Sequence, residues 1–175
     1  SGYGFVKELI EKSSPFGAKV VSLCGRYYAM DRDKRWERVQ LAYNMLVNGE
    51  GQHANDLLEA LNTSYADGVT DEFIKPIVLT NGFQSLKADD AVFCFNFRTD
   101  RCREITQVLT QKNVEDFGMH TLPLYYVTMT VYDETYVGVR TIFNNAQLQK
   151  TLGEIVSLNG KTQLRAAETE KYPHV

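Results

Sequence analysis

Two stretches of the sequence place a pair of arginines directly after a predicted strand. Arg26 and Arg32 follow the run that ends at Cys24, and Arg98 and Arg101 follow the run that ends at Phe97. In an open α/β sheet, ligands bind beyond the carboxyl ends of the strands, where helix N-termini add backbone donors. A guanidinium group binds phosphate or carboxylate through two parallel hydrogen bonds. Two such pairs at one crevice would suit a small ligand with two anionic groups.

Three aspartates, Asp31, Asp33 and Asp100, lie among these arginines. They could orient the guanidinium groups or accept hydrogen bonds from ligand hydroxyls. The alternative is a solvated helix start of mixed charge, because the block 26–38 sums to 5 − 3 = +2. The repetition of one arrangement after two separate strands favours an anion-binding site.

The sequence lacks the motifs of several catalytic sites. It has no GxxxxGK[ST] phosphate loop and no GxSxG nucleophile elbow. A phosphate-binding cysteine loop needs arginine six positions after the cysteine, where this chain has Met30 and Asp100. None of His53, His120 and His174 has a partner at metal-ligand spacing, so no metal site is expected from this chain alone. The sequence therefore predicts binding groups without a catalytic centre.

The cysteines Cys24, Cys94 and Cys102 form an odd set without CxxC spacing. Neither a disulfide framework nor a zinc site is expected from them. Free thiols are typical of a reducing compartment, which predicts a cytoplasmic protein.

Composition excludes other partners. The 175 residues carry a net charge of −3, which argues against a nucleic-acid binder. No apolar run approaches the ~20 residues of a membrane span. With 43% hydrophobic and 23% charged residues, the chain has the composition of a globular protein.

Hydrophobic periodicity predicts strands that alternate with helices. Helices are expected over 4–12, from Asp33 to about 47, and over about 54–66, 100–111 and 148–158, with strands over 19–24, 77–79, 91–97, 124–132 and 162–167. Residues 133–146 show no clean period and are interpreted as a connector. This order predicts an α/β fold with a largely parallel sheet flanked by helices.

Five segments of the sequence carry a family resemblance. They are GRYYAMDRDKRWER at 25–38, YADGVTDEF at 65–73, FNFRTDR at 95–101, the segment from Asn145-Ala146 to TLGE at 151–154, and AAETEKYPHV at 166–175. In this order and at this approximate spacing they resemble cofactor-independent (2,3-bisphosphoglycerate-independent) phosphoglycerate mutase. The resemblance covers the whole chain, and GRYYAMDRD alone is highly specific.

The resemblance implies an isomerase of glycolysis and gluconeogenesis. The family enzyme has a phosphotransferase domain inserted into a metal-binding domain of the alkaline phosphatase superfamily. It interconverts 3-phosphoglycerate and 2-phosphoglycerate through a phosphoserine intermediate. Two metal ions, usually manganese, and the serine nucleophile lie outside this chain. A cytoplasmic enzyme that is monomeric at full length is implied.

The family's substrate-binding residues carry over position by position. Arg26 and Arg32 match the arginines of its GRYYAMDR motif, Arg98 and Arg101 match those of its FNFRxDR motif, and Lys171 matches the lysine of its AETEKY motif. No catalytic residue and no metal ligand is carried over, because the family's nucleophile, its GRD motif and its metal ligands match no position of this sequence.

The resemblance also implies a division into domains. Residues 1–135 would form an incomplete phosphotransferase domain, 136–146 a hinge, and 147–175 the start of the C-terminal part of the phosphatase-like domain. The chain is thus expected to be an internal piece, inactive alone, whose segment 147–175 packs poorly. The alternative is a free-standing module that binds anions or phosphometabolites without catalysis.

Overall fold

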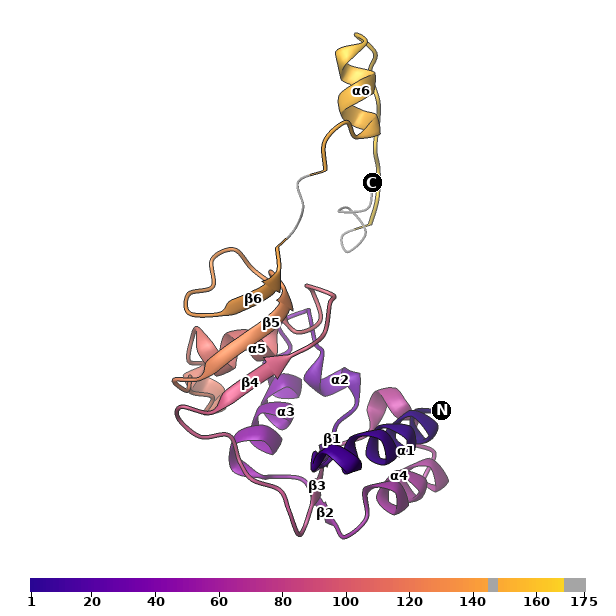
Figure 1. Cartoon of the computed structure of the whole chain (residues 1–175), viewed down its shortest axis with the longest axis vertical. Helices are drawn as coiled ribbons and strands as arrows, with labels where there is room; N and C mark the ends of the chain where they lie inside the picture. Colours follow the sequence, from indigo (N-terminus) through magenta and orange to yellow (C-terminus); the bar gives the residue numbers. More distant parts are fainter. Residues whose placement is uncertain (145–147, 169–175) are drawn as a thin grey trace. The chain divides into compact units, whose positions relative to one another are not determined.

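The computed structural model describes residues 1–144 and 148–168. The chain divides into two compact units, Ser1–Asn144 and Asn145–Val175, which are described separately. The first unit carries both arginine-bearing stretches, and Figure 1 shows its elements.

Short helices and short strands alternate along the first unit. The helices are α1 (Gly2–Ser13), α2 (Arg26–Ala29), α3 (Trp36–Asn48), α4 (Leu57–Ala66) and α5 (Arg103–Thr110). The strands are β1 (Ser22–Leu23), β2 (Gln52–Ala54), β3 (Ile77–Leu79), β4 (Ala91–Cys94), β5 (Tyr125–Thr130) and β6 (Arg140–Phe143). Single 3₁₀ turns lie at Ser14–Phe16, Asp71–Phe73 and Glu115–Phe117.

The strands form two small sheets. In the first, of order β1-β3-β2, β3 pairs antiparallel with β1 and parallel with β2. The second, of order β4-β5-β6, is parallel throughout, with Cys94 opposite Thr128 and Thr128 opposite Thr141. The expected α/β class with largely parallel pairing is confirmed, but the parallel strands belong to two sheets.

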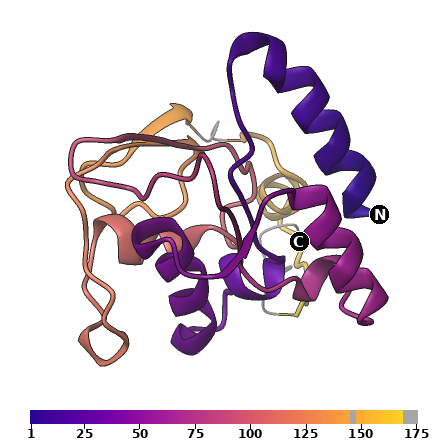
Figure 2. The ribbon, with the colours of Figure 1, turned by 90° about the horizontal axis from the view of Figure 1, so that it is seen from below.

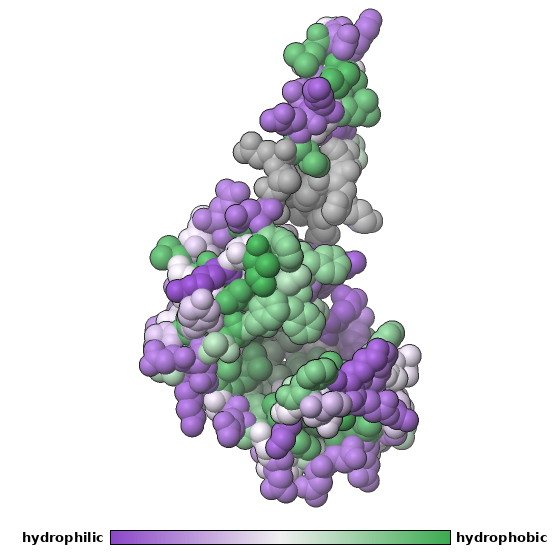
Figure 3. Space-filling model, viewed as in Figure 1, coloured by the Kyte–Doolittle hydropathy of each residue, from purple (hydrophilic) through white to green (hydrophobic). Residues whose placement is uncertain are grey.

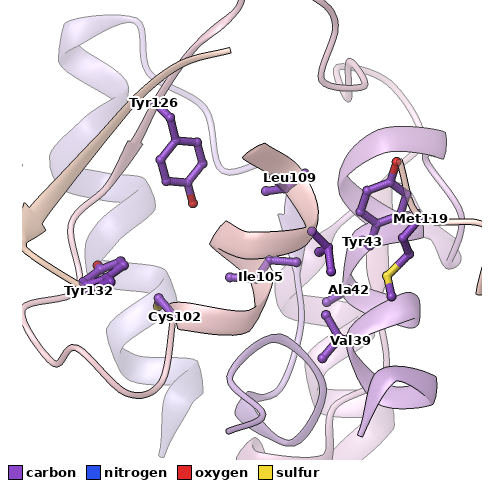
Figure 4. Packing of buried hydrophobic residues seen from close by; sticks show 10 residues of the cluster. Val39, Ala42, Tyr43, Cys102, Ile105, Leu109, Met119, Tyr126 and Tyr132 are labelled. Carbon is purple, nitrogen blue, oxygen red and sulfur yellow. The ribbon is translucent and has the colours of Figure 1, made fainter. Parts of the chain in front are cut away.

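The larger core lies between α3, α5 and one face of the second sheet (Figure 4). Val39 and Ala42 of α3 meet Val108 and Leu109 of α5, and all four are almost completely buried. Tyr126 points from β5 into this core, where its hydroxyl lies 3.1 Å from Thr106 Oγ1. This core supports the strand that precedes residues 95–101 and the helix that follows them.

A smaller core packs α4 against β3. Leu57 and Leu61 of α4 are buried with Ile77 of β3, and Tyr3 and Val6 of α1 cover their edge. Figure 2 shows α1 beside α4. Asp56 begins α4 by accepting the backbone N–H groups of Leu58 and Glu59 at 2.7 and 3.1 Å.

The other face of the second sheet is exposed. Phe93 and Tyr125 are both 51% exposed, and Phe95 and Phe97, beyond the end of β4, are 74% and 70% exposed. Figure 3 shows an apolar patch over this part of the first unit. Parallel sheets are usually covered on both faces, so this open face is unusual.

Most of the predicted elements are present, several of them with shorter bounds. The helix expected from Asp33 is α3, the strand at 77–79 is β3, and the helix expected from about 54 begins only after Asp56 caps it. The strand expected over 91–97 stops at Cys94, and the helix expected from 100 starts at Arg103. Three short elements, α2, β2 and β6, were not predicted.

In the second unit, the described residues include the helix α6 (Leu152–Leu158). Thr151 caps it by accepting the Glu154 N–H at 3.3 Å, and Leu152 and Leu158 are 69% and 75% exposed. The strand predicted over 162–167 is wrong, since these residues form no regular element. A strand needs a neighbour for its hydrogen bonds, and within the described chain this segment pairs with none.

No helix in the described parts of the chain is both long enough and apolar enough to cross a membrane.

Candidate functional site

A polar cavity of about 210 Å³ lies where the two arginine-bearing stretches meet. Its lining includes four arginines and three acidic side chains: Arg26, Arg32, Arg38 and Arg101, with Asp31, Asp33 and Glu72, beside Tyr27 and Met30. The balance of ionised groups therefore favours an anion.

The first stretch is held against the segment 72–74 by close backbone contact at Gly25. Its N–H donates to the Ile74 carbonyl at 2.7 Å. A Cβ at this position would lie 2.3 Å from the Glu72 carbonyl oxygen, so only glycine fits. This contact places Arg26 beside Glu72, and the two side chains form an ion pair at 2.9 Å.

Asp31 organises the turn between α2 and α3. Its Oδ2 accepts the backbone N–H groups of Asp33 and Arg35 at 3.0 and 2.9 Å, and its Oδ1 lies 3.5 Å from Arg38. The residue is only 5% exposed. Its carboxylate oxygens are therefore engaged in holding the loop and contact Arg38, which is not one of the four arginines that Asp31 was expected to orient.

Two contacts join the second stretch to the first. Arg32 forms an ion pair with Asp100 at 3.0 Å, and Arg101 donates from Nη1 to the Met30 carbonyl at 3.1 Å. Burial acts to raise the pKa of Asp100, but the hydrogen bonds from Arg32 and from a backbone N–H, together with the charges of Arg32 and Arg101, lower it overall. Asp100 is thus an ionised partner that holds Arg32 at the cavity.

Arg38 lines the cavity although the sequence pattern did not predict it as a site residue. Its guanidinium carbon lies 3.9 Å from the centroid of the Tyr27 ring, in addition to its contact with Asp31. In the sequence, Arg38 entered only as one of the charges of the block 26–38. Between Arg32 and Arg38 the chain passes through the loop 33–35, in which the N–H groups of Asp33 and Arg35 donate to Asp31, and both arginine side chains line the cavity.

Three of the five predicted site residues, Arg26, Arg32 and Arg101, line the cavity. Arg98 is not among the lining residues: its side chain is exposed, and its backbone N–H donates to Asn96 Oδ1 at 3.0 Å. The two arginine pairs were expected to converge on one crevice. Both members of the first pair line the cavity, but of the second pair only Arg101 does. Lys171 lies outside the described residues.

A buried carboxyl group on α5 contacts the first stretch. Glu104 is 5% exposed, and its Oε1 accepts the Lys34 N–H at 2.7 Å. Burial raises its pKa, the hydrogen bond from the Lys34 N–H lowers it, and Asp31 and Asp33 raise it, so that the pKa is about 7 in all. The protonation of Glu104 is thereby coupled to the aspartates of the first stretch.

The described residues contain no group of three or more His, Cys, Asp or Glu side chains that could hold a metal ion. The carboxylates at the cavity are engaged with arginines and backbone N–H groups. This part of the chain therefore offers an anion site and no fitting set of metal ligands.

The sequence is similar to a known family and to its members. Residues 1–134 match the sequence model of the family described as the BPG-independent PGAM N-terminus. The chain is 53% identical over 162 residues to the 2,3-bisphosphoglycerate-independent phosphoglycerate mutase of Flavobacterium psychrophilum, covering 90% of this chain and 32% of that protein. It is 51% identical over 176 residues to the protein of the same name from Bacteroides thetaiotaomicron, covering 100% and 35%.

The fold is also similar to a solved structure. Leishmania mexicana phosphoglycerate mutase, in a crystal structure at low cobalt concentration, matches with a TM-score of 0.74 and 26% identity over 91% of this chain and 32% of that chain. The chain therefore spans about a third of the length of the curated relatives it matches.

Proposed function

The chain belongs to the BPG-independent phosphoglycerate mutase family by the match over residues 1–134, and on that premise we propose that it supplies substrate-binding arginines to an enzyme that interconverts 3-phosphoglycerate and 2-phosphoglycerate. The observation that carries the proposal is the cavity at which Arg26, Arg32 and Arg101 meet. A phosphoglycerate has a phosphate and a carboxylate, which are the two groups that arginine binds with paired hydrogen bonds.

In this proposal the ligand displaces the carboxylates of Glu72 and Asp100 from the arginines that they pair with. Glu72 and Asp100 hold the guanidinium groups of Arg26 and Arg32 at 2.9 and 3.0 Å. An arriving phosphate or carboxylate competes with these carboxylates for arginines that are already positioned. Pre-positioned cations lose little side-chain entropy on binding, which favours the ligand.

Arg98 and Lys171 are assigned to the substrate through the family resemblance alone. Arg98 is exposed in a loop beside the cavity residue Arg101, so a ligand that reaches past the cavity could meet it. Lys171 is proposed to approach the phosphoryl group from the phosphatase-like domain.

The rest of the reaction is proposed to lie in other parts of the whole protein. We assign the nucleophilic serine and two manganese ions, which stabilise charge on the phosphoryl oxygens when bound, to segments outside residues 1–175. Residues 1–135 are proposed as the phosphotransferase domain, 136–146 as the hinge and 147–175 as the return into a domain of the alkaline phosphatase superfamily. We also propose a cytoplasmic monomer that acts in glycolysis and gluconeogenesis.

The test measures mutase turnover of 3-phosphoglycerate by the complete polypeptide that contains these residues. Arg101→Ala and Arg32→Ala should lower kcat/KM strongly, whereas Lys12→Ala on α1, outside the cavity lining, should leave it unchanged. The 175-residue chain alone should bind phosphoglycerate weakly and turn none over. Binding by the complete polypeptide without any turnover would instead support an anion-binding module.

A further inference from the structure

Two thiols lie at the ends of the loop that carries Arg98 and Arg101. Cys94 is the last residue of β4, and Cys102 immediately precedes α5. The loop 95–101 runs between them. Any change in the distance between the two sulfurs therefore acts on both ends of this loop.

The two side chains lie in one network of contacts. The pKa of each thiol is shifted by the other, which places the two sulfurs near each other. Asn96 Nδ2 donates to Cys102 Sγ at 3.3 Å, and the Tyr132 hydroxyl donates to Cys94 Sγ at 3.4 Å. Figure 4 shows Cys102 and Tyr132 near each other at the start of α5. The pair is thus built into the larger core.

The neighbours also make the two thiols unequal. The hydrogen bond from Cys102 lowers the pKa of Cys94 below its usual range, against burial and with help from Tyr132. The pKa of Cys102 is raised by its hydrogen bond to Cys94 and by burial. Cys94 is half-buried and Cys102 is 6% exposed, so Cys94 is the more accessible and the more nucleophilic thiol.

We propose that Cys94 and Cys102 are a redox-modification site that forms a reversible disulfide across the base of the loop 95–101. The oxidant is a hydroperoxide, and the reductant that reverses the reaction is an external dithiol. The site is an addition to the anion cavity and uses none of its arginines.

The reaction proceeds in two balanced steps. The Cys94 thiolate attacks one oxygen of the hydroperoxide, the O–O bond breaks, and Cys94 becomes a sulfenic acid while water or an alcohol leaves. The Cys102 sulfur then attacks the Cys94 sulfur, the S–O bond breaks, and the thiol proton leaves with the hydroxide as water. Two electrons pass from the two thiols to the peroxide.

The disulfide would be connected to Arg98 and Arg101 through Asn96 and the backbone. A disulfide draws the two sulfurs to about 2.05 Å, closer than two thiols that are not bonded to each other. Asn96 contacts Cys102 Sγ through Nδ2 and holds the Arg98 N–H through Oδ1, while Arg101 is covalently next to Cys102. Oxidation should therefore displace Arg98 and Arg101. That this lowers substrate turnover rests on the proposed mutase function.

The third cysteine provides a matched control. Cys24 directly follows β1 of the first sheet, whereas the pair flanks a loop of the second, and burial raises the pKa of Cys24 to about 12. It should therefore react slowly with peroxide and form no disulfide with either thiol.

The experiment treats the complete polypeptide with hydrogen peroxide at neutral pH, blocks free thiols and digests with trypsin. Cleavage after Lys87, Arg98, Arg101 and Arg103 would leave the peptide 88–98 joined to the dipeptide 102–103, which mass spectrometry detects. Mutase activity is measured on the same samples before oxidation, after it and after dithiothreitol. Cys102→Ser and Cys24→Ser are treated in parallel.

We expect the cross-linked peptide in the wild type and in Cys24→Ser, and its absence from Cys102→Ser. Turnover should fall roughly ten-fold or more, as for a displaced positioning group, and dithiothreitol should restore it. Absence of the cross-link, or an equal loss of activity in Cys102→Ser, would overturn the proposal, and a cross-link with unchanged turnover would overturn its effect on the site. If the reduced protein turns over no phosphoglycerate yet forms the cross-link, the mutase proposal fails and the disulfide site stands.

Discussion

The two arginine-bearing stretches reach the same cavity but are held in different ways. Residues 25–38 are positioned by their own backbone, through the close approach at Gly25 and the N–H groups that Asp31 accepts. Residues 95–101 are held mainly by side chains, through Asn96, the thiol pair and the ion pair of Asp100 with Arg32. Residues 25–38 are therefore held rigidly, whereas the position of residues 95–101 depends on side-chain contacts that oxidation or substitution can change.

The largest effect should come from Gly25→Ala. The new Cβ would lie 2.3 Å from the Glu72 carbonyl oxygen, and a backbone neighbour cannot turn aside as a side chain can. We expect a loss of about 3 kcal/mol or more in the free energy of unfolding, measured by urea denaturation of the 175-residue chain.

Gly4→Ala is the matched control for this substitution. Gly4 lies inside α1, and a Cβ added there would meet nothing within 4 Å, so alanine should stabilise the chain by about 0.5–1 kcal/mol. Equal effects of the two substitutions would show that residues 25–38 are not sterically held.

Glu104 tests the electrostatic connection between the first stretch and α5. Its folded-state pKa of about 7 lies above the ordinary 4.5, so the folded protein holds this proton more tightly than the unfolded chain. The contribution of Glu104 to stability should therefore fall as pH rises from about 4.5 to about 7.

Glu104→Gln removes this titration and keeps an oxygen that can accept the Lys34 N–H. At pH 8 the free energy of unfolding of the variant should exceed that of the wild type by about 3 kcal/mol at most. Near pH 4.5 the two values should be similar. Urea denaturation at both pH values measures the difference. A stability difference that does not change with pH would contradict the buried, raised-pKa carboxyl group.

Much of the first unit could be predicted from strong local signals in the sequence. The apolar face of α3 and the Asp56 cap of α4 can be recognised from residues close together in the sequence. Arg26, Arg32 and Arg101 were predicted as site residues because they follow predicted strands. The resemblance, and not periodicity, identified the family.

The features that could not be predicted depend on contacts between distant residues. β6 exists because it pairs with β5, and Arg38 reaches the cavity only because Asp31 turns the chain. The segment predicted as a strand over 162–167 had the right composition, but no strand of the described residues pairs with it. The proximity of Cys94 and Cys102 could not be predicted either, since the two thiols approach each other across the loop 95–101 and have no recognised spacing motif.

Substitution of Arg101 and of Arg98 tests the cavity and the exposed part of the second stretch separately. Arg101→Ala removes a lining guanidinium and its bond to the Met30 carbonyl, so phosphoglycerate binding by the complete polypeptide should weaken by about 1.5–3 kcal/mol. If Arg98 also meets the ligand, as the resemblance implies, Arg98→Ala should cost a similar amount without affecting stability. Isothermal titration calorimetry and urea denaturation measure the two quantities, and unchanged binding in Arg98→Ala would remove that residue from the site.

The smallest effect should come from Asn96, the side chain that links Cys102 to Arg98. Asn96→Ala loses both the donor to Cys102 Sγ and the acceptor for the Arg98 N–H, and should lower the free energy of unfolding by about 1 kcal/mol. Asn96→Asp keeps an oxygen for the Arg98 N–H and loses only the donor to sulfur. If the second stretch depends on this side chain, phosphoglycerate binding should weaken more in Asn96→Ala than in Asn96→Asp. Equal binding by both variants and the wild type would mean that the loop 95–101 is positioned by its backbone, as residues 25–38 are, and the contrast between the two stretches would disappear.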